Sequence, residues 1–321
     1  MARRPRIALV TPALASANTG NWHTAARWAR LLAPVARVGV MGAWTGGDEA
    51  LLIALHARRS APSIAAWHAA HPDRPLVVVL TGTDLYRDID HDADAQQSLQ
   101  WADALVVLNT CGATRLPPAL RPRTTVVLQS CPARRPLAKP TRHLRVVMVG
   151  HLRDEKDPQT YLQAARLLAH RPDIRLDHLG AALDPALAEA ARRTMADCPQ
   201  YRWLGPVTRA EARRRIQAAH VLVNASRMEG GAQVVIEAVR SGTAVLASRI
   251  DGHRGLLDDA HPGFFAPGDA AGLAALITAC RDDAAMLPRL EAWGAERAPR
   301  FEPAREAAAL QQLVASLLAP R

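Results

Sequence analysis

The sequence predicts an α/β protein of two domains, each built on a parallel sheet. Short apolar runs bounded by turn residues alternate with helix-like stretches along the chain, which is typical of strands joined by helical crossovers. These runs are continuously apolar rather than alternating, so we expect strands that are covered on both faces. A chain of 321 residues is too long for one compact core. Two domains with a cleft between them follow from these observations.

The strands expected in the first half are IALVTP, RVGVMG, LLIALH, LVVVLTG, ALVVLN and TVVLQ, and the first of them is predicted over residues 6–14. In the second half they are RVVMVG, IRLDHLG, YRWLG, VLVNAS and AVLAS. Residues 130–143 are rich in proline and basic residues and lack apolar periodicity, which predicts a linker. Residues 303–318 start with proline and continue at helical spacing. We therefore expect domains at 1–135 and 136–302, and a final helix within 303–321 that can pack on either half, including back on the first domain.

Composition excludes several classes of function. The formal charge of +10 comes almost wholly from arginines spread along the chain, without a basic tail or an aromatic-rich basic patch. We therefore expect a small anionic substrate and no nucleic acid. The four cysteines lack the close pairs of a zinc or dithiol site, and no metal site is predicted. No segment is long and apolar enough to cross a membrane, and the N-terminal residues favour a strand over a signal peptide. A cytoplasmic protein is expected.

The segment VLVNASRMEGGAQVVIEAVRSGTAVLAS in the second half predicts a strand, a glycine turn, a helix, a turn and a strand. The helix is expected to begin near Gly231 or Ala232, where its unpaired first amides could receive a phosphate. Glu229 stands on the loop, and Glu237 lies roughly 9 Å along the helix at 1.5 Å per residue. Each carboxylate could accept hydrogen bonds from adjacent sugar hydroxyls, one at either end of a nucleotide-sugar. Alternatively, both glutamates are ordinary solvated charges.

The run SRMEGGAQVVIEA resembles the E-x7-E signature of retaining, family 4-like glycosyltransferases of the glycogen-synthase-like superfamily. The resemblance implies the GT-B fold, in which two Rossmann-like domains with parallel sheets face each other across a cleft. It also implies an N-terminal acceptor domain and a C-terminal donor domain. In that family Glu237 would bind the donor ribose and Glu229 would face the transferred sugar. Contacts to the diphosphate or that sugar would come from the amides of Gly230, Gly231, Ala232 and Gln233.

A second motif, VGHLRDEKDPQTYLQAA, resembles the family's G-R-L-x3-K-G pattern. Lys156 fits the pattern, and the resemblance implies that it neutralises the leaving diphosphate as the glycosidic bond breaks. His151 stands where arginine is usual, and it is expected to contact the donor. Asp157 stands where glycine is usual. Arg153 is either a second catalytic cation or a surface arginine at a helix entry.

The first half carries the acceptor candidates. Residues 16–21 follow the first strand, and in them Gly20 could touch the donor phosphates or the acceptor, with Asn18 and Asn21 as acceptor contacts or as turn and cap residues. The run LVVVLTGTDLYRD ends a strand where ligands gather in parallel sheets. Thr81 takes the place of the family's usual histidine in an H-G-x-D pattern, and Asp84 fits it. A hydroxyl acceptor would find no obvious base, which favours an acceptor that already carries a nucleophilic charge.

The combination of ANTGNWHTAARWARLL, LHARRSAPSI, VVVLTGTDLYRDI and SRIDGHRGLL resembles the selenosugar synthases of selenoneine biosynthesis, one branch of the superfamily. That resemblance implies UDP-N-acetylglucosamine as donor, selenophosphate as acceptor, and a 1-seleno sugar and UDP as products, without a cofactor. It implies a functional link to a selenophosphate synthetase and a selenoneine synthase. Arg58, Arg59 and Arg87 are candidate selenophosphate ligands because guanidinium matches phosphate geometry, although any of them could be a surface charge.

Three alternatives remain open at this stage. The chain could be an ordinary glycosyltransferase that acts on a hydroxyl of a saccharide, lipid or small molecule. A dinucleotide-dependent oxidoreductase would need G-x-G-x-x-G after the first strand, whereas residues 16–21 hold one glycine. A non-catalytic nucleotide-sugar binding protein would not explain Lys156 together with the paired glutamates.

Overall fold

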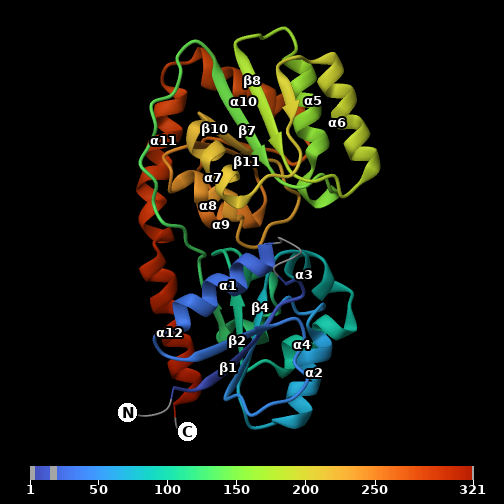
Figure 1. The fold of residues 1–321 in the computed structure, drawn as a ribbon, viewed down its shortest axis with the longest axis vertical. Coiled ribbons are helices and arrows are strands. Elements are labelled where there is room, and N and C mark those ends of the chain that lie inside the picture. Colours follow the sequence, from blue (N-terminus) through green and yellow to red (C-terminus); the bar gives the residue numbers. More distant parts are fainter. Residues whose placement is uncertain (1–3, 15–19, 320–321) are drawn as a thin grey trace. The chain divides into compact units, whose positions relative to one another are not determined.

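The computed structural model describes residues 4–14 and 20–319. The chain divides into two compact units, coloured along the sequence in Figure 1. The first unit consists of Met1–Ser130, Glu229–Gly231 and Glu302–Arg321, and the second consists of Cys131–Met228 and Ala232–Phe301.

The first unit contains a six-stranded sheet in the order β2-β1-β3-β4-β5-β6, in which every pairing is parallel. Its strands are β1 (Arg6–Val10), β2 (Arg37–Met41), β3 (Leu51–Leu55), β4 (Leu76–Leu80), β5 (Ala104–Val107) and β6 (Thr124–Val126). Its α-helices are α1 (Gly20–Leu32), α2 (Ala61–Ala70), α3 (Thr83–Tyr86), α4 (Ala93–Trp101) and α12 (Pro303–Leu318), and short 3-10 helices lie at Asp88–Asp90, Gly112–Arg115 and Pro118–Arg123.

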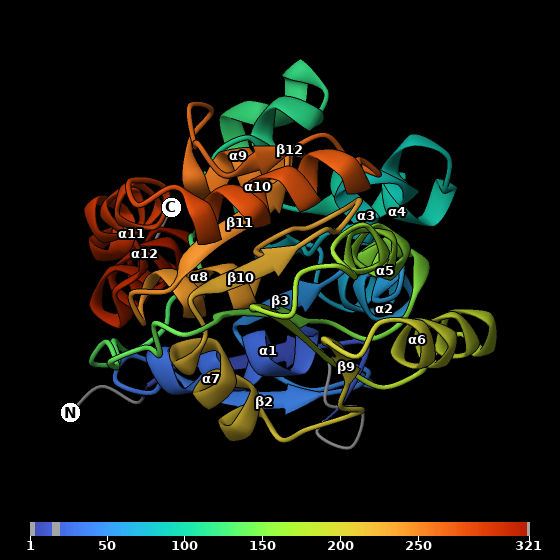
Figure 2. The same cartoon turned by 90° about the horizontal axis from the view of Figure 1, so that it is seen from above.

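Both faces of this sheet are buried, as the continuously apolar strands predict. Ile7 and Leu9 of β1 point into a core that they share with Trp28 of α1, and Leu310 and Val314 of α12 complete that core. The intervening strand residues face the opposite core, which is filled from α2 and α4. Helices therefore cover the two faces of the sheet (Figures 1 and 2).

The second unit contains another parallel six-stranded sheet, in the order β12-β11-β10-β7-β8-β9. Its strands are β7 (Leu144–Val149), β8 (Ile174–Leu179), β9 (Tyr201–Trp203), β10 (Val221–Asn224), β11 (Ala244–Ser248) and β12 (Phe264–Phe265). Its α-helices are α5 (Pro158–Leu167), α6 (Pro185–Asp197), α7 (Arg209–Ala218), α8 (Gln233–Val239), α9 (Asp251–Leu257), α10 (Ala270–Asp282) and α11 (Met286–Arg297), with 3-10 helices at Asp154–Lys156 and Ala298–Phe301. Numbered within this unit, the strands follow the doubly wound order 3-2-1-4-5-6, in which the strand order reverses between β7 and β10.

The predicted α/β class with parallel sheets is confirmed, and the structure corrects some boundaries. The first strand ends at Val10, before the proline, rather than at residue 14. The short strand β12 was not predicted, because two residues carry no periodicity. Residues 127–143 form neither helix nor strand, in agreement with the expected linker, and the final helix occupies the predicted residues 303–318. Among the described helices, none has the length and apolar character needed to span a bilayer.

Candidate active site

The reversal of strand order in the second unit places two predicted motifs next to each other. β7 and β10 pair in parallel, with Val223 opposite Met148, so the loops that follow them leave the same edge of the sheet. These loops are residues 150–157 and 225–232. The backbone amide of Arg227 donates to the carbonyl of Glu155 at 3.0 Å, which joins one loop to the other. Ligands of doubly wound sheets bind at this position.

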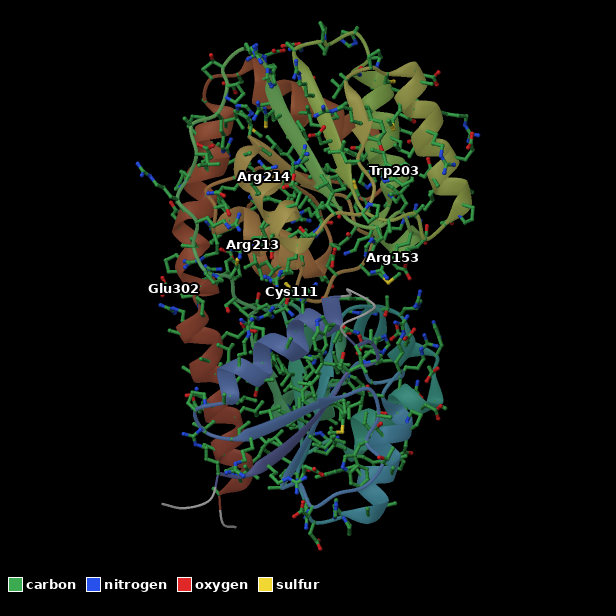
Figure 3. The ribbon with its side chains drawn as sticks, viewed as in Figure 1. Cys111, Arg153, Trp203, Arg213, Arg214 and Glu302 are labelled. Atoms are coloured by element: carbon green, nitrogen blue, oxygen red, sulfur yellow. The ribbon has the colours of Figure 1, made fainter. Side chains whose placement is uncertain are left out.

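The first loop presents the predicted cations. Lys156 ends a 3-10 helix, and its Cγ and Cδ lie 3.5 Å from where a Cβ on Gly150 would stand, so its stem lies along the glycine backbone. Arg153, labelled in Figure 3, is half-buried with its Nε 3.8 Å from Oε2 of Glu155. Lys156 and Arg153 therefore lie on one short loop at the sheet edge.

Asp157 shows why glycine is usual at its position in the family pattern. Its backbone is left-handed, with φ 44° and ψ 57°, and it is the residue that precedes α5. Aspartate is among the few side chains that tolerate this conformation. Its carboxylate also accepts a hydrogen bond from Thr160 Oγ1 at 2.7 Å. The substitution therefore keeps the backbone path of the motif.

His151 is half-buried and hydrogen-bonded through its ring. The backbone amide of Ala181 donates to Nδ1 of His151 at 3.0 Å. Burial lowers the pKa of His151 below its usual value, and the positive charges of Arg153 and Lys156 lower it further. His151 is therefore neutral near pH 7, unlike the arginine that is usual there.

The second loop differs from expectation at the start of its helix. α8 begins at Gln233 rather than at Gly231 or Ala232, because Ala232 has φ 26° and ψ 60°, outside the helical region. Glu237 is four residues after Gln233, so it lies about 6 Å along the axis rather than 9 Å.

Glu229, Gly230 and Gly231 are buried and pack with the first unit. The side-chain amide of Asn109 donates to the carbonyl of Gly230 at 2.8 Å. A Cβ on Gly230 would approach the carbonyl oxygen of Thr81 to 2.2 Å, so only glycine fits at this position.

Glu237 has two arginine partners that the sequence did not predict. It is 4% exposed, and its Oε1 lies 3.2 Å from Nη2 of Arg209 and 3.8 Å from Nε of Arg213. Both arginines project from α7, where Arg213 is labelled in Figure 3. The sequence did carry a local signal, because Thr208 caps α7 and precedes Glu211 by three residues, and residues 209 and 213 then share one helix face. Opposing charges therefore hold the predicted ribose-binding carboxylate in place.

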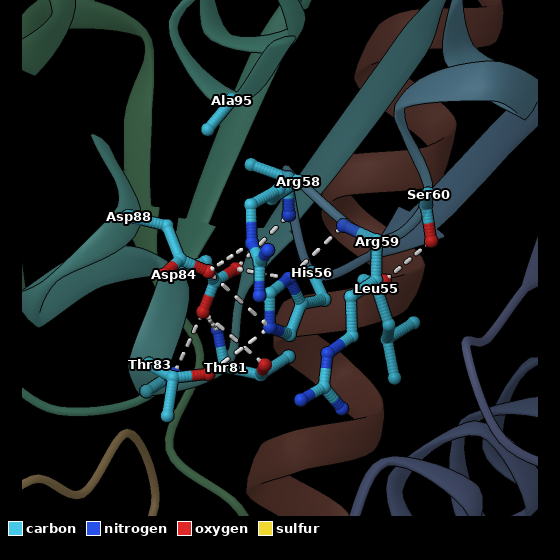
Figure 4. A network of polar contacts seen from close by, with 12 residues as sticks. Leu55, His56, Arg58, Arg59, Ser60, Thr81, Thr83, Asp84, Asp88 and Ala95 are labelled. Carbon is cyan, nitrogen blue, oxygen red and sulfur yellow. Dashed lines mark hydrogen bonds and ion pairs between the residues drawn. The ribbon is translucent and has the colours of Figure 1, made fainter. Parts of the chain in front are cut away.

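In the first unit, Asp84 fixes the loop after β4 (Figure 4). It is fully buried, and its Oδ1 accepts from the backbone amides of Thr81 and Gly82, both at 2.9 Å. Its Oδ2 accepts from the amide of Ala57 at 3.0 Å. With its oxygens engaged in this way, Asp84 shapes the loop, and the acceptor contact predicted for it does not fit this arrangement.

His56 lies beside this loop and is inaccessible. It is 1% exposed, and its Nε2 is 3.0 Å from Oγ1 of Thr83 (Figure 4). Burial lowers the pKa of His56, against the opposing effect of Asp84. As a packed residue at a strand end, it does not replace the base that is missing at Thr81.

The three candidate arginines of this unit are not equivalent. Arg58 and Arg87 direct Nε to the two carboxylate oxygens of Asp88, at 2.8 Å and 3.1 Å. Burial of Asp88 would raise its pKa, but these hydrogen bonds and charges outweigh it and the pKa is lowered. Arg59 is exposed, and its guanidinium forms no hydrogen bond or ion pair with any described side chain. Of the three, Arg59 is the best placed to bind an anion.

The remaining predicted residues lie at the start of α1. Gly20 is its first residue and is exposed, and Asn21 follows it, half-buried. Asn18 lies outside the described residues. Within the described parts of the chain, histidine, cysteine, aspartate and glutamate form no group of three that could hold a metal ion.

Comparisons with known proteins find relatives of this chain. Residues 143–283 match the family model for glycosyl transferases group 1. D-inositol 3-phosphate glycosyltransferases of Streptomyces avermitilis and Streptomyces coelicolor are 32% and 31% identical over 182 residues, 53% of this chain. The aligned region is 39% of each of those proteins, so the chain matches well under half of their length.

Solved structures extend the likeness in fold to the whole chain. Sucrose-phosphate synthase from Thermosynechococcus elongatus superposes with a TM-score of 0.77 at 19% identity, covering 98% of this chain and 99% of that one. Anabaena HepE, solved with UDP-glucose, gives a TM-score of 0.75 at 14% identity, covering 98% and 100%. The chain therefore has the fold of these GT-B proteins.

Proposed function

Because the chain has the GT-B fold and its second unit matches the group 1 glycosyl transferases, we propose that it is a glycosyltransferase with a UDP-sugar donor. We propose further that the donor is UDP-N-acetylglucosamine, that the acceptor is selenophosphate, and that the product is a 1-seleno sugar. The observation that supports the donor half is the hydrogen bond from the Arg227 amide to the Glu155 carbonyl, which joins the loop carrying Lys156 to the start of the loop after β10, where the strand order reverses. The matched relatives and the HepE complex with UDP-glucose support this choice of donor class.

In this proposal each donor residue has a separate task. Lys156 neutralises the negative charge that grows on the diphosphate as the bond to the sugar breaks. Glu237, held by Arg209 and Arg213, accepts hydrogen bonds from the ribose hydroxyls. Glu229 faces the transferred sugar, and the amides from Gly230 to Gln233 contact the diphosphate or that sugar. No protein nucleophile is required.

The acceptor half rests on the loop after β4. Thr81 supplies no base, and the nearby His56 is buried with its Nε2 against Thr83. A hydroxyl acceptor would have to lose its proton without help from these side chains, whereas the selenium of selenophosphate already carries negative charge. Arg59 can contribute an exposed guanidinium to its phosphate oxygens.

The proposed reaction has two steps, and a bond is formed and a bond is broken in each. Selenium forms a bond to the anomeric carbon while the bond from that carbon to the UDP oxygen breaks, and UDP leaves with the electron pair. Water then cleaves the phosphorus–selenium bond and releases phosphate and the 1-seleno sugar. A selenophosphate synthetase would supply the acceptor, and a selenoneine synthase would consume the product.

The test is product analysis with the full chain. Purified protein is incubated with UDP-N-acetylglucosamine and one acceptor at a time: selenophosphate, thiophosphate, D-inositol 3-phosphate or a simple sugar. Mass spectrometry should find UDP and a selenium-bearing hexosamine with selenophosphate. UDP release with the hydroxyl acceptors alone would overturn the selenium assignment and leave the donor assignment standing.

The second candidate is transfer to a hydroxyl acceptor, and the inositol phosphate glycosyltransferases among the relatives favour it. They match about half of this chain, and the aligned share of their own length is smaller still. A glycosylated inositol phosphate in the same panel would establish this candidate in place of the first.

A further inference from the structure

His151 occupies the position where the family pattern carries arginine, and its hydrogen bonding defines what it can offer a ligand. A backbone N–H can donate only to a ring nitrogen that carries a lone pair. The Ala181 amide donates to Nδ1 of His151 at 3.0 Å, so the proton of the neutral ring must be on Nε2. Protonation of Nδ1 would bring two N–H groups into opposition.

The partner amide is rigidly placed. The carbonyl of Ala181 accepts from the amide of Leu152 at 2.9 Å, so the residue holding the ring is itself paired with the loop that carries it. Gly180 permits this approach, because a Cβ there would come within 1.9 Å of the Gly150 carbonyl oxygen. The indole of Trp203, labelled in Figure 3, donates to the carbonyl of Gly180 at 2.9 Å.

The positively charged side chains near the His151 ring disfavour its protonation, as burial does. Arg153 and Lys156 on its own loop lower its pKa after burial has done so. From β8, the buried His178 directs Nε2 to the Gly150 carbonyl at 3.3 Å, and burial lowers its pKa to about 4. Asp184, the acidic residue of the adjoining loop, uses its carboxylate to cap α6. Among the described residues, the charges that act on the His151 ring are those of Arg153 and Lys156, and both disfavour its protonation.

We propose that His151 is a tautomer-fixed neutral donor, which offers Nε2–H to an oxygen of the diphosphate or sugar while Lys156 supplies the positive charge. This rests on the proposed donor function and deepens it. The consequence is a site that binds the nucleotide with one fewer positive charge than the family pattern provides. Nucleotide affinity therefore does not depend on an imidazolium.

The first measurement is the tautomer of His151 in the full chain. Nitrogen-15 NMR at pH 8 should show a protonated Nε2 and an unprotonated Nδ1. Assignment comes from His151→Gln, which removes one set of signals. A ring that carries its proton on Nδ1, or holds two protons at this pH, overturns the proposal. This measurement needs neither substrate nor activity.

The second measurement is UDP binding by calorimetry. His151→Gln keeps an N–H donor of similar reach and should bind UDP within about threefold of the parent, whereas His151→Phe should lose about tenfold or more, the effect of one hydrogen bond to a charged group. Far-UV circular dichroism checks that both variants fold. Equal affinity in the parent and His151→Phe refutes the donor role. If the parent fails to bind UDP while its NMR tautomer is as described, the proposed function fails and the tautomer assignment stands.

Discussion

Replacing Glu306 with alanine should destabilise the first unit severely. This carboxylate is 1% exposed at the start of α12, and it accepts from Arg27 Nε at 2.8 Å, Trp28 Nε1 at 2.7 Å and the backbone amide of Ser130 at 2.9 Å. The Ser130 hydroxyl also donates to it. Arg27 is 6% exposed, so the variant would bury a guanidinium without its counter-charge.

The expected loss follows from that uncompensated charge. Removing one partner of a buried ion pair costs about 3–5 kcal/mol, a large part of the ~5–15 kcal/mol that stabilises a typical domain. For a domain of this size, the unfolding midpoint should fall by roughly 6–20 °C. Differential scanning calorimetry of the full chain, with tryptophan fluorescence in urea, measures both quantities.

Two further variants test whether the unpaired Arg27 charge causes the loss of stability. Asp90→Ala removes an exposed ion pair of the same unit, Arg115 to Asp90 at 3.0 Å, and should cost less than about 1 kcal/mol. The double variant Arg27→Met with Glu306→Leu removes both buried charges and should recover about half of the loss, leaving the Trp28 and Ser130 donors without their acceptor. If Glu306→Ala costs no more than Asp90→Ala, or if the double variant is worse than Glu306→Ala, the buried charge is not the cause.

Three further outcomes are expected. Glu237→Ala should abolish measurable UDP-sugar binding by calorimetry with an unchanged fold. Glu211→Ala, which removes a half-buried partner of Arg214 and Arg215 on α7, should bind normally. Unchanged affinity in Glu237→Ala would remove the donor assignment. Ala232→Gly should raise the free energy of unfolding by roughly 1 kcal/mol, because glycine adopts φ 26° without the steric cost that alanine meets. If urea denaturation gives a lower free energy of unfolding for this variant, Ala232 is not strained. Burial lowers the pKa of His178 and of His261 to about 4, so between that value and about 6.5 the unfolded chain binds more protons than the folded one. The free energy of unfolding should therefore fall as the solution is acidified from pH 6.5 to 4, by up to about 1.4 kcal/mol per pH unit for each histidine, and a shallower slope is expected in His261→Gln.

The sheets could be predicted from sequence because burial on both faces imposes a local pattern on each strand. β12 escaped detection because two residues, Phe264–Phe265, are too few to carry one. The final helix was bounded correctly because Pro303 and the helical spacing of Leu310 and Val314 are local signals as well. Local signals therefore determine what a single sequence reveals about this fold.

Pairings between distant residues were not predictable in this way. Glu237 is 28 positions from Arg209, and Arg58 is 30 positions from Asp88. In a chain this rich in arginine, many guanidiniums are available for each carboxylate, and tertiary structure decides which of them meets it. For this reason the sequence did not reveal that Arg58 and Arg87 pair with Asp88, or that Arg209 and Arg213 pair with Glu237.

The three departures from the family motifs have different physical meanings. Asp157 keeps a left-handed backbone that glycine would also adopt, so that change leaves the loop path intact. Thr81 lies in a loop whose backbone amides still donate to Asp84, so the loop keeps its shape while a possible base is lost. His151 keeps a hydrogen-bond donor and loses a charge. Backbone shape or hydrogen bonding is retained in each case while acid–base or charge character changes.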